Sequence, residues 1–215
     1  MQKYFLIIFL CGASNVFAQT KDYKIFIPKN YDTLIGGFAK DDLNKDGIGD
    51  IALALYHKIE KENTEVDDDS FPPRLLIILI GTQNGYIESA KSQTALLCKK
   101  CGGLFGDPIE GISIEKNILI ISHYGGSAWR WSITDKFRFQ NNDWFLIGET
   151  KNSYWDVEMC DKLKDFAGTN YDDENFVTGE FEIKKISEDC KLLENKKGRR
   201  AIKPLILLAN FNIDN

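Results

Sequence analysis

The sequence predicts a mainly β protein, a single domain built as an antiparallel sheet or sandwich with little helix. Three observations carry this prediction. Residues alternate between two faces with period two over 129–139, the run 75–80 is continuously apolar, and short apolar segments are separated by Gly, Asn and Asp turns. Helical spacing is scarce, and only 161–166 has room for a turn or two.

The first 18 residues are typical of a secretory signal peptide. Lys3 precedes an apolar run from Tyr4 to Leu10, and Val16 and Ala18 provide small or apolar residues before a cleavage site. The segment is too short to span a bilayer as a helix. We therefore expect cleavage after Ala18, a β-rich domain over 19–215, no transmembrane segment, and an exported protein that is periplasmic or secreted.

The charge balance bears on the partners. The chain has a net charge of −5, and loss of Lys3 with the signal makes it more negative. An acidic surface argues against nucleic acid as the main partner. We expect the acidic runs 67–69 and 172–174 to be solvated loops rather than additional metal sites.

The first half of the chain is expected to contain an opening strand, a hairpin, a charged loop and a buried strand. Leu75–Ile80 is apolar throughout, which is typical of a strand buried on both faces. An Asn-Gly turn at 82–85 leads into a return strand. The expected elements are a strand at 23–28, paired strands at 33–38 and 51–56, a loop at 58–73, a strand at 86–90, and a short helix or strand at 92–97.

The second half is expected to contain mostly hairpins. Residues 101–108 form a glycine-rich loop without the lysine of a phosphate-binding loop. The period-two alternation of 129–139 is the clearest strand signal in the chain. The expected elements are a hairpin of 112–115 and 118–122, a long strand at 129–139, its partner at 144–148, and late strands within 176–186 and 201–211.

The segment from Asp42 to Asp50 reads D-x-N-x-D-G-x-x-D, which is the pattern of a calcium loop. Ca²⁺ prefers six to eight oxygen ligands, and a short loop supplies them when alternate residues converge. Gly47 permits the sharp turn. The predicted ligands are the side chains of Asp42, Asn44, Asp46 and Asp50 and the backbone carbonyl of Ile48. The alternative is an Asp/Asn/Gly turn that binds no metal.

This segment is not an EF-hand, because Leu53 occupies the position of the bidentate Glu and apolar strands flank the loop. Residues 42–53 instead resemble the FG-GAP/VCBS repeat of integrin-type propellers and secreted bacterial proteins, although Asp41 replaces a usual Gly. The resemblance implies a structural Ca²⁺ held by the five residues above. No period of 40–45 residues recurs, so we expect one such hairpin within a larger sheet. Segments 101–108 and 122–131 are similar to exported bacterial proteins without an assigned activity.

Five cysteines are reduced to four when Cys11 leaves with the signal. Four in an exported chain are consistent with two disulfides, and the favoured pairing is Cys98–Cys101 with Cys160–Cys190. A redox role for the first pair is an alternative, because Lys99 and Lys100 would stabilise a thiolate. A zinc site is another, although the second pair lacks a C-x-x-C spacing.

The aromatic residues suggest both core and binding roles. Trp129 and Trp131 share a parity with Ile133, Phe137 and Phe139, which predicts that they face the core rather than a sugar. The candidate exposed ligand contacts lie in less regular stretches, and they are Tyr124, Tyr154 and Trp155.

Catalytic motifs are weak. His57 and His123 are the only histidines, and neither lies in a nucleophile elbow or an H-E-x-x-H motif. We therefore expect a non-enzymatic, exported, calcium-binding β protein that interacts with an unknown protein or glycan partner or with the envelope. The alternatives are an exported hydrolase acting on glycans or cell-wall material, with structural calcium, and a periplasmic thiol protein using Cys98 and Cys101.

Overall fold

The computed structural model describes residues 21–62 and 71–214. The signal peptide predicted at 1–18, Cys11 and the acidic run 67–69 lie outside the described residues. None of the helices in the described part of the chain is long and apolar enough to cross a membrane.

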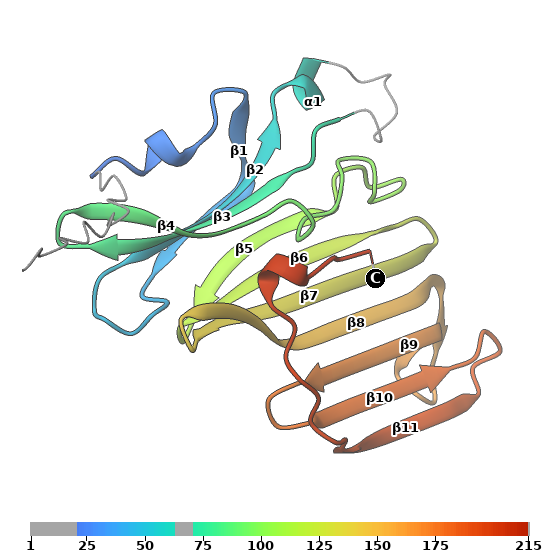
Figure 1. Ribbon diagram of the computed structural model, residues 1–215. Helices are drawn as coiled ribbons and strands as arrows, with labels where there is room; N and C mark the ends of the chain where they lie inside the picture. The colour runs from blue at the N-terminus through green and yellow to red at the C-terminus, as the bar shows by residue number, and fades with distance from the viewer. Residues whose placement is uncertain (1–20, 63–70, 215) are drawn as a thin grey trace, which may run out of the picture.

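Two antiparallel sheets make up the fold, which confirms the predicted mainly β class (Figure 1). The smaller sheet has the order β1-β2-β3-β4, and its strands are β1 (Tyr31–Asp41), β2 (Asp50–His57), β3 (Leu75–Thr82) and β4 (Gly85–Ser92). The larger sheet has the order β11-β10-β9-β8-β7-β6-β5. Its strands are β5 (Ile109–Glu115), β6 (Ile118–Gly126), β7 (Trp129–Gln140), β8 (Asp143–Cys160), β9 (Asp165–Asn175), β10 (Glu180–Ile186) and β11 (Leu192–Arg199).

The two sheets meet where β1 lies beside β5 (Figure 1). Gly36 in β1 has a φ of +70°, and a Cβ there would lie 3.1 Å from the carbonyl oxygen of Glu110. Gly111 in β5 likewise lies against the Gly36 backbone. Glycine therefore permits a backbone approach between the sheets that a side chain would obstruct. Register between β1 and β2 shifts between Thr33 and Phe38, around this contact.

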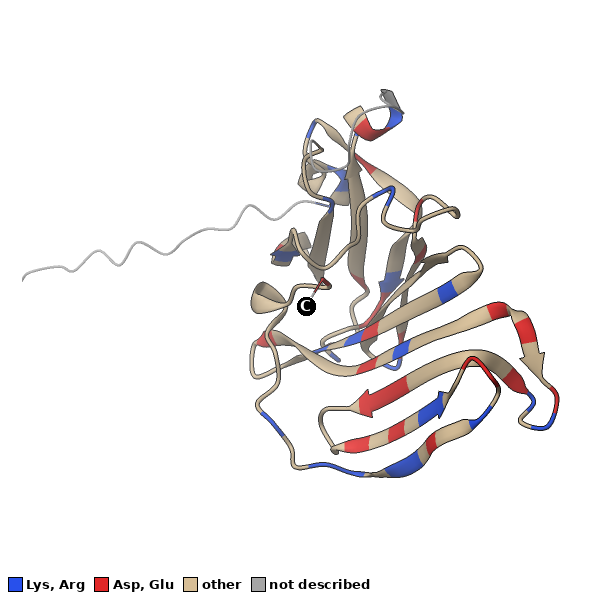
Figure 2. Ribbon diagram, turned by 90° about the vertical axis from the view of Figure 1, so that its right-hand side faces the viewer, with Lys and Arg blue, Asp and Glu red and all other residues tan. Residues whose placement is uncertain are grey.

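The main hydrophobic core lies between the sheets. The smaller sheet contributes residues such as Ala52, Leu76 and Ile78, and the larger sheet contributes Leu119 and Phe137. The buried members from the larger sheet come from strands β5 to β8. Strands β9 to β11 extend beyond the smaller sheet, where basic and acidic residues are interspersed along them (Figure 2).

The smaller sheet is buried on its second face as well. There Leu53 and Ile77 form a cluster with other residues of β2 and β3, packed against Tyr23 and Phe26. This two-sided burial confirms the prediction for Leu75–Ile80. The predicted strand at 23–28 is wrong, because Tyr23–Phe26 forms the 3₁₀ helix η1, with the Lys24 N–H donating to the Asp22 carboxylate.

Four further predictions of local structure are wrong. Residues 93–96 form bends rather than a helix or strand, and 161–164 form a turn that leads into β9 rather than a helix. The predicted loop at 58–73 begins with the short helix α1 (Ile59–Glu62). The acidic run at 172–174 lies within β9 rather than in a loop, where Arg200 forms an ion pair with Glu174.

The end of the chain differs from its predicted strand at 201–211. After β11 it runs back across the larger sheet as an extended segment and ends in the 3₁₀ helix η3 (Leu208–Asn210) (Figure 1). Its backbone bonds to β8, where the Leu146 N–H donates to the Ile206 carbonyl at 2.9 Å. Phe211 then packs edge-on against Phe137 at 5.1 Å between ring centroids. Of the late strand predicted within 176–186, residues from Glu180 onwards form β10.

Candidate functional site

The predicted calcium loop joins β1 to β2, as the sequence pattern predicts. Two of its residues, Lys45 and Gly47, have positive φ angles of 69° and 81°. The Asp42 carboxylate lies across the loop and accepts the N–H of Lys45 at 2.6 Å and the N–H of Gly47 at 3.0 Å. These bonds hold the turn closed around the first predicted ligand.

The next two predicted ligands are connected to each other. The Asp46 N–H donates to Oδ1 of Asn44 at 3.0 Å, and the Ile48 N–H donates to Oδ1 of Asp46 at 2.8 Å. The Asn44 amide also donates to Oδ2 of Asp46 at 2.9 Å. The side chains at positions 1, 3 and 5 therefore already bond the loop backbone.

Asp50, the last predicted ligand, is fully buried at the start of β2. Its Oδ2 accepts the N–H groups of Leu43 at 2.7 Å and Asn44 at 3.2 Å, and its Oδ1 accepts the N–H of Gly81 at 2.7 Å. Burial raises the pKa of this carboxyl, against the opposing effect of the three backbone donors. Asp50 thus connects the loop to β3.

The donor chemistry of the loop suits a hard cation, because every predicted ligand atom is an oxygen and three of the side chains are carboxylates. The nearby Asp46 carboxylate adds to the effect of burial in raising the pKa of Asp50, and a cation between the two groups would oppose this effect. Within residues 21–62 and 71–214, however, no three His, Cys, Asp or Glu side chains converge as a metal-binding group. Calcium binding therefore stays a prediction, and it requires the loop to draw closer around the ion.

The loop also contacts the larger sheet. Leu43, between the first two predicted ligands, is 1% exposed and belongs to the core between the sheets. The carbonyl of Asp42 accepts a hydrogen bond from the Asn117 side chain, which lies in the turn between β5 and β6. The loop is therefore positioned to fix the junction of the two sheets.

The cysteines pair as predicted. Cys98 bonds Cys101, and Cys160 at the end of β8 bonds Cys190. The second bond lies in a small cluster with Ala167 and Ile186. All four cysteines of the described residues are thus engaged in disulfides, which disagrees with a zinc site.

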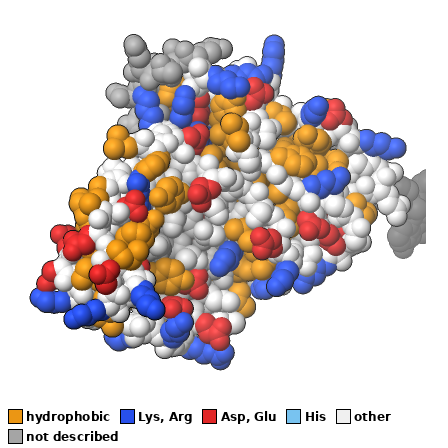
Figure 3. Space-filling model, turned by 180° about the vertical axis from the view of Figure 1, so that it is seen from behind, with side chains coloured by type: hydrophobic (Ala, Val, Ile, Leu, Met, Phe, Trp, Pro, Cys, Tyr) orange, Lys and Arg blue, Asp and Glu red, His pale blue; other side chains and the backbone are white. Residues whose placement is uncertain are grey.

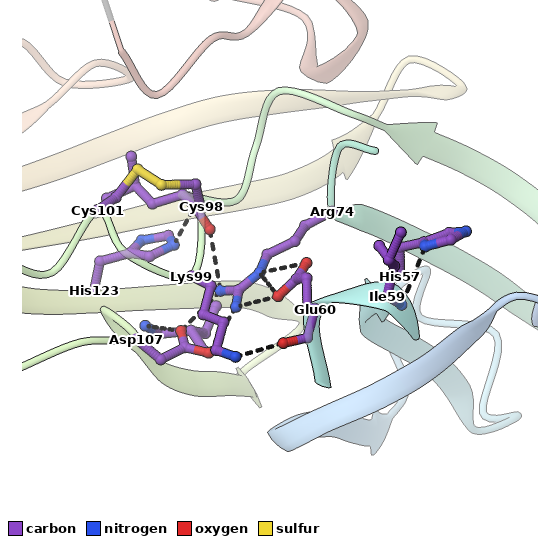
Figure 4. Close-up of polar contacts among 11 residues, drawn as sticks. His57, Ile59, Glu60, Arg74, Cys98, Lys99, Cys101, Asp107 and His123 are labelled. Carbon is purple, nitrogen blue, oxygen red and sulfur yellow. Dashed lines mark hydrogen bonds and ion pairs between the residues drawn. A yellow bond between two sulfur atoms is a disulfide. The ribbon is translucent and has the colours of Figure 1, made fainter. Parts of the chain in front are cut away.

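A buried ionic network lies beside the first disulfide (Figure 4). The side chain of Arg74 is 2% exposed, and its guanidinium donates to Glu60 at 2.9 Å and to Asp107 at 2.6 Å. It also donates to the Leu97 carbonyl at 3.1 Å. The network connects α1, the start of β3 and the loop before β5, and the guanidinium donors face protein acceptors.

A cavity of about 420 Å³ opens beside this network, between β1 and the start of β5. Its walls are apolar over most of their area, with Leu34, Tyr56 and Ile109 among them. The charged residues that line it are Lys61, Lys99, Glu110 and the network residues Glu60, Arg74 and Asp107. Lys99 donates to the Glu60 carbonyl and Lys61 lies over the Tyr56 ring, so both are engaged within the protein.

The residues considered for hydrolysis do not form an accessible site. His123 is fully buried, and its pKa falls to about 4 because of burial and the nearby Arg74 charge. His57 accepts the Ile59 N–H at 3.3 Å. A pair of carboxyl groups, Asp135 and Glu149, lies across β7 and β8, but Asp135 is fully buried.

The predicted ligand contacts separate onto two faces of the larger sheet. Tyr124 and Tyr154 contact each other. Burial raises the pKa of Tyr154 to about 12, and the contact with Tyr124 contributes to this rise. Tyr154 stacks on Phe166 at 4.7 Å. Trp155 points to the opposite, inner face and contacts Trp129 at 5.4 Å between ring centroids.

Tyr124 and Tyr154 therefore belong to one cluster, in which Tyr154 contacts both Tyr124 and Phe166.

On the rear of the molecule, hydrophobic side chains are interspersed with charged ones rather than forming one continuous apolar area (Figure 3). Trp131, Phe137 and Phe139 face the core as predicted, whereas Trp129 is 41% exposed.

Comparison with known proteins finds no matching family model, no matching curated protein and no matching solved structure. The resemblance to FG-GAP/VCBS repeats therefore depends on the residues of the loop and its flanking strands alone.

Sequence reasoning missed several residues that shape these sites. Asn117 lies in a turn where it and Lys116 both have positive φ, and the Lys-Asn pair between two apolar runs is a turn signal. That signal locates the turn but not its contact with Asp42. Nothing in the local sequence indicates that Arg74, Glu60 and Asp107 meet, because they are far apart along the chain.

Proposed function

We propose that this chain is an exported calcium-binding β protein in which the ion is structural and the domain serves binding or envelope interaction. The observation that carries the proposal is the position of the loop between the two sheets. Asp50 connects it to β3, Leu43 to the core, and the Asp42 carbonyl to Asn117 in the larger sheet.

The residues proposed to hold the ion are the side chains of Asp42, Asn44, Asp46 and Asp50 and the carbonyl of Ile48. The ion would supply positive charge to three carboxylates that otherwise repel one another. The chain itself contributes the rest, because the N–H groups of Lys45 and Gly47 orient Asp42 and those of Leu43 and Gly81 orient Asp50. A loop made more rigid by the ion would also make the junction between the two sheets more rigid.

Export is supported by the two disulfides, because such bonds persist mainly in oxidising compartments. The signal peptide stays a prediction from the sequence. A cell fractionation that follows the chain with and without residues 1–18 tests it, and cytoplasmic recovery of the full-length chain would contradict export.

Direct titration tests calcium binding. Metal-stripped protein is titrated with Ca²⁺ and separately with Mg²⁺ by calorimetry, beside an Asp46→Ala variant. We expect one Ca²⁺ site that Asp46→Ala weakens at least tenfold, and a weaker response to Mg²⁺, which demands stricter octahedral geometry. An exposed-acid control, Asp161→Ala, should leave the titration unchanged. If titration of the unaltered protein with Ca²⁺ gives no heat of binding, the proposal is contradicted.

A further inference from the structure

Part of the inner face of the larger sheet is not covered by the smaller sheet. Residues directly opposite in register share a face, and Phe137 identifies the inner one. On this face Trp129 pairs with Trp155, Ser153 with Asn170, and Lys151 with Asp172. We refer to these six residues as the Trp129 face.

The two tryptophans form a fixed aromatic pair at the end of this face. Trp129 is 41% exposed, and its ring lies against Gly168, where a Cβ would be 2.3 Å from the ring. Gly168 also has a φ of +65°. The position therefore favours glycine both because of this backbone conformation and because a Cβ would clash with the Trp129 ring. Trp155 packs on the cluster of Cys160 and Ala167 beside the second disulfide. Both rings are held by the fold while Trp129 keeps area open to solvent.

Hydrogen-bonding groups continue from the tryptophans along β8 and β9. Asn170 is exposed, and the side chains of Lys151 and Asp172 are 43% and 46% exposed. Oδ1 of Asp172 is buried, Oδ2 of Asp172 lies 3.8 Å from the Arg200 guanidinium, and Lys151 forms an ion pair with Glu149 at 3.1 Å. The row offers the hydroxyl of Ser153 and the amide of Asn170 to a ligand, while Lys151 and Asp172 are engaged in ion pairs and neither sign of charge dominates.

This arrangement discriminates between classes of partner. Strands β7, β8 and β9 are paired on both sides, so a peptide cannot bind here by adding a strand. The mixed charges do not attract a polyanion. Rigid aromatic rings next to mixed donors and acceptors instead suit a ligand with apolar ring faces and many hydroxyl groups.

We propose that the Trp129 face binds a neutral oligosaccharide, with Trp129 and Trp155 stacking on sugar rings and Ser153 and Asn170 bonding hydroxyl groups. This assignment rests on the proposed binding role of the domain but not on the calcium ion. It names the glycan class of partner and the surface that contacts it.

The test uses three soluble neutral probes, cellohexaose, xylohexaose and chitohexaose, titrated into the full-length protein in millimolar Ca²⁺. Binding is followed by tryptophan fluorescence and calorimetry. We expect saturable binding of at least one probe, weakened at least tenfold by Trp129→Ala and by Trp155→Ala. A tenfold loss corresponds to about 1.4 kcal/mol. Asn170→Ala, a change at an exposed side chain, should weaken binding without altering the melting temperature.

The matched control is Phe105→Ala, which removes an aromatic ring that is 48% exposed outside the Trp129 face. It should bind the probe unchanged. No saturable binding of any probe, or binding that both tryptophan variants and Asn170→Ala leave intact, would overturn the assignment. Asp46→Ala separates the two proposals, because loss of calcium binding with sugar binding retained would show that the two sites are independent and that failure of one proposal leaves the other standing.

Discussion

The buried carboxylate of Asp50 accepts the N–H of Gly81 at 2.7 Å, across the boundary between β2 and β3. The same carboxylate accepts two N–H groups from the start of loop 42–50. One side chain therefore connects the candidate calcium loop to the centre of the smaller sheet. Any event that rearranges the loop acts on a strand that is buried on both faces.

Asp50→Ala tests this connection without any metal. The substitution leaves the N–H groups of Leu43, Asn44 and Gly81 without their acceptor, and we expect it to cost roughly 3 kcal/mol of stability in EDTA. Urea denaturation provides the measurement. The exposed neighbour Asp41→Ala serves as the control. A cost for Asp50→Ala no larger than that of the control would contradict the structural role of this carboxylate.

Arg74→Met tests the buried ionic network. Removing the guanidinium leaves Glu60 and Asp107 without their partner, with Glu60 buried, so we expect a loss of roughly 3–5 kcal/mol. Lys191→Ala breaks a highly exposed ion pair with Asp189 and should have no measurable effect. Equal unfolding midpoints for the two variants would show that the Arg74 network is not structural.

The two disulfides should differ in their effect on stability. Cys160 and Cys190 are 30 residues apart, whereas Cys98 and Cys101 are three apart. Because the entropy lost by the unfolded chain grows with loop length, we expect Cys160→Ala/Cys190→Ala to cost roughly 3–4 kcal/mol and Cys98→Ala/Cys101→Ala distinctly less. Denaturation of both double variants under non-reducing conditions gives the comparison. The reverse order would contradict it.

The pH dependence of stability should include a component from Asp135. Burial and the neighbouring Glu149 raise the pKa of Asp135 to about 7, from an ordinary value of 3.8. The unfolded chain then releases this proton at lower pH than the folded chain. This contribution to stability is present below about pH 4 and is lost as pH rises towards 7, at up to about 1.4 kcal/mol per pH unit.

Asp135→Asn removes that component, because the amide does not titrate. The difference in unfolding free energy between the variant and the unaltered protein should therefore shift in favour of the variant as pH rises from 4 to 7. Urea denaturation at a series of pH values measures it. A difference that stays constant across this range would show that Asp135 titrates normally.

Much of the fold was predictable because its strands have local signals. The continuous apolar run of β3 and the period-two alternation of β7 each identify a strand without knowledge of its partners. Strands β9 and β11 lacked such signals. β9 contains Asp172, Asp173 and Glu174, whose charges are paired with residues such as Arg200 from a distant part of the chain. Long-range pairing makes a strand of a segment that reads locally as a loop.

The sites were predictable to a similar degree. The oxygen-bearing residues of loop 42–50 and both cysteine pairs follow from spacing and composition. The burial of Asp50 and the separation of Trp155 from Tyr124 and Tyr154 do not, because they depend on tertiary register. Parity within β8 places Tyr154 and Trp155 on opposite faces, but the sequence does not tell which face stays open.

The central claim is that calcium stabilises the sheet junction through loop 42–50. Thermal unfolding of metal-stripped protein in millimolar Ca²⁺ and in EDTA, beside Asp46→Ala and Asp161→Ala, tests it most directly. At about 100 times its dissociation constant the ion should add roughly 2.7 kcal/mol, and this should raise the melting temperature of the unaltered protein and of Asp161→Ala but not of Asp46→Ala. Equal melting temperatures in calcium and EDTA for the unaltered protein would contradict the claim. Loop 42–50 would then be an Asx turn that binds no metal.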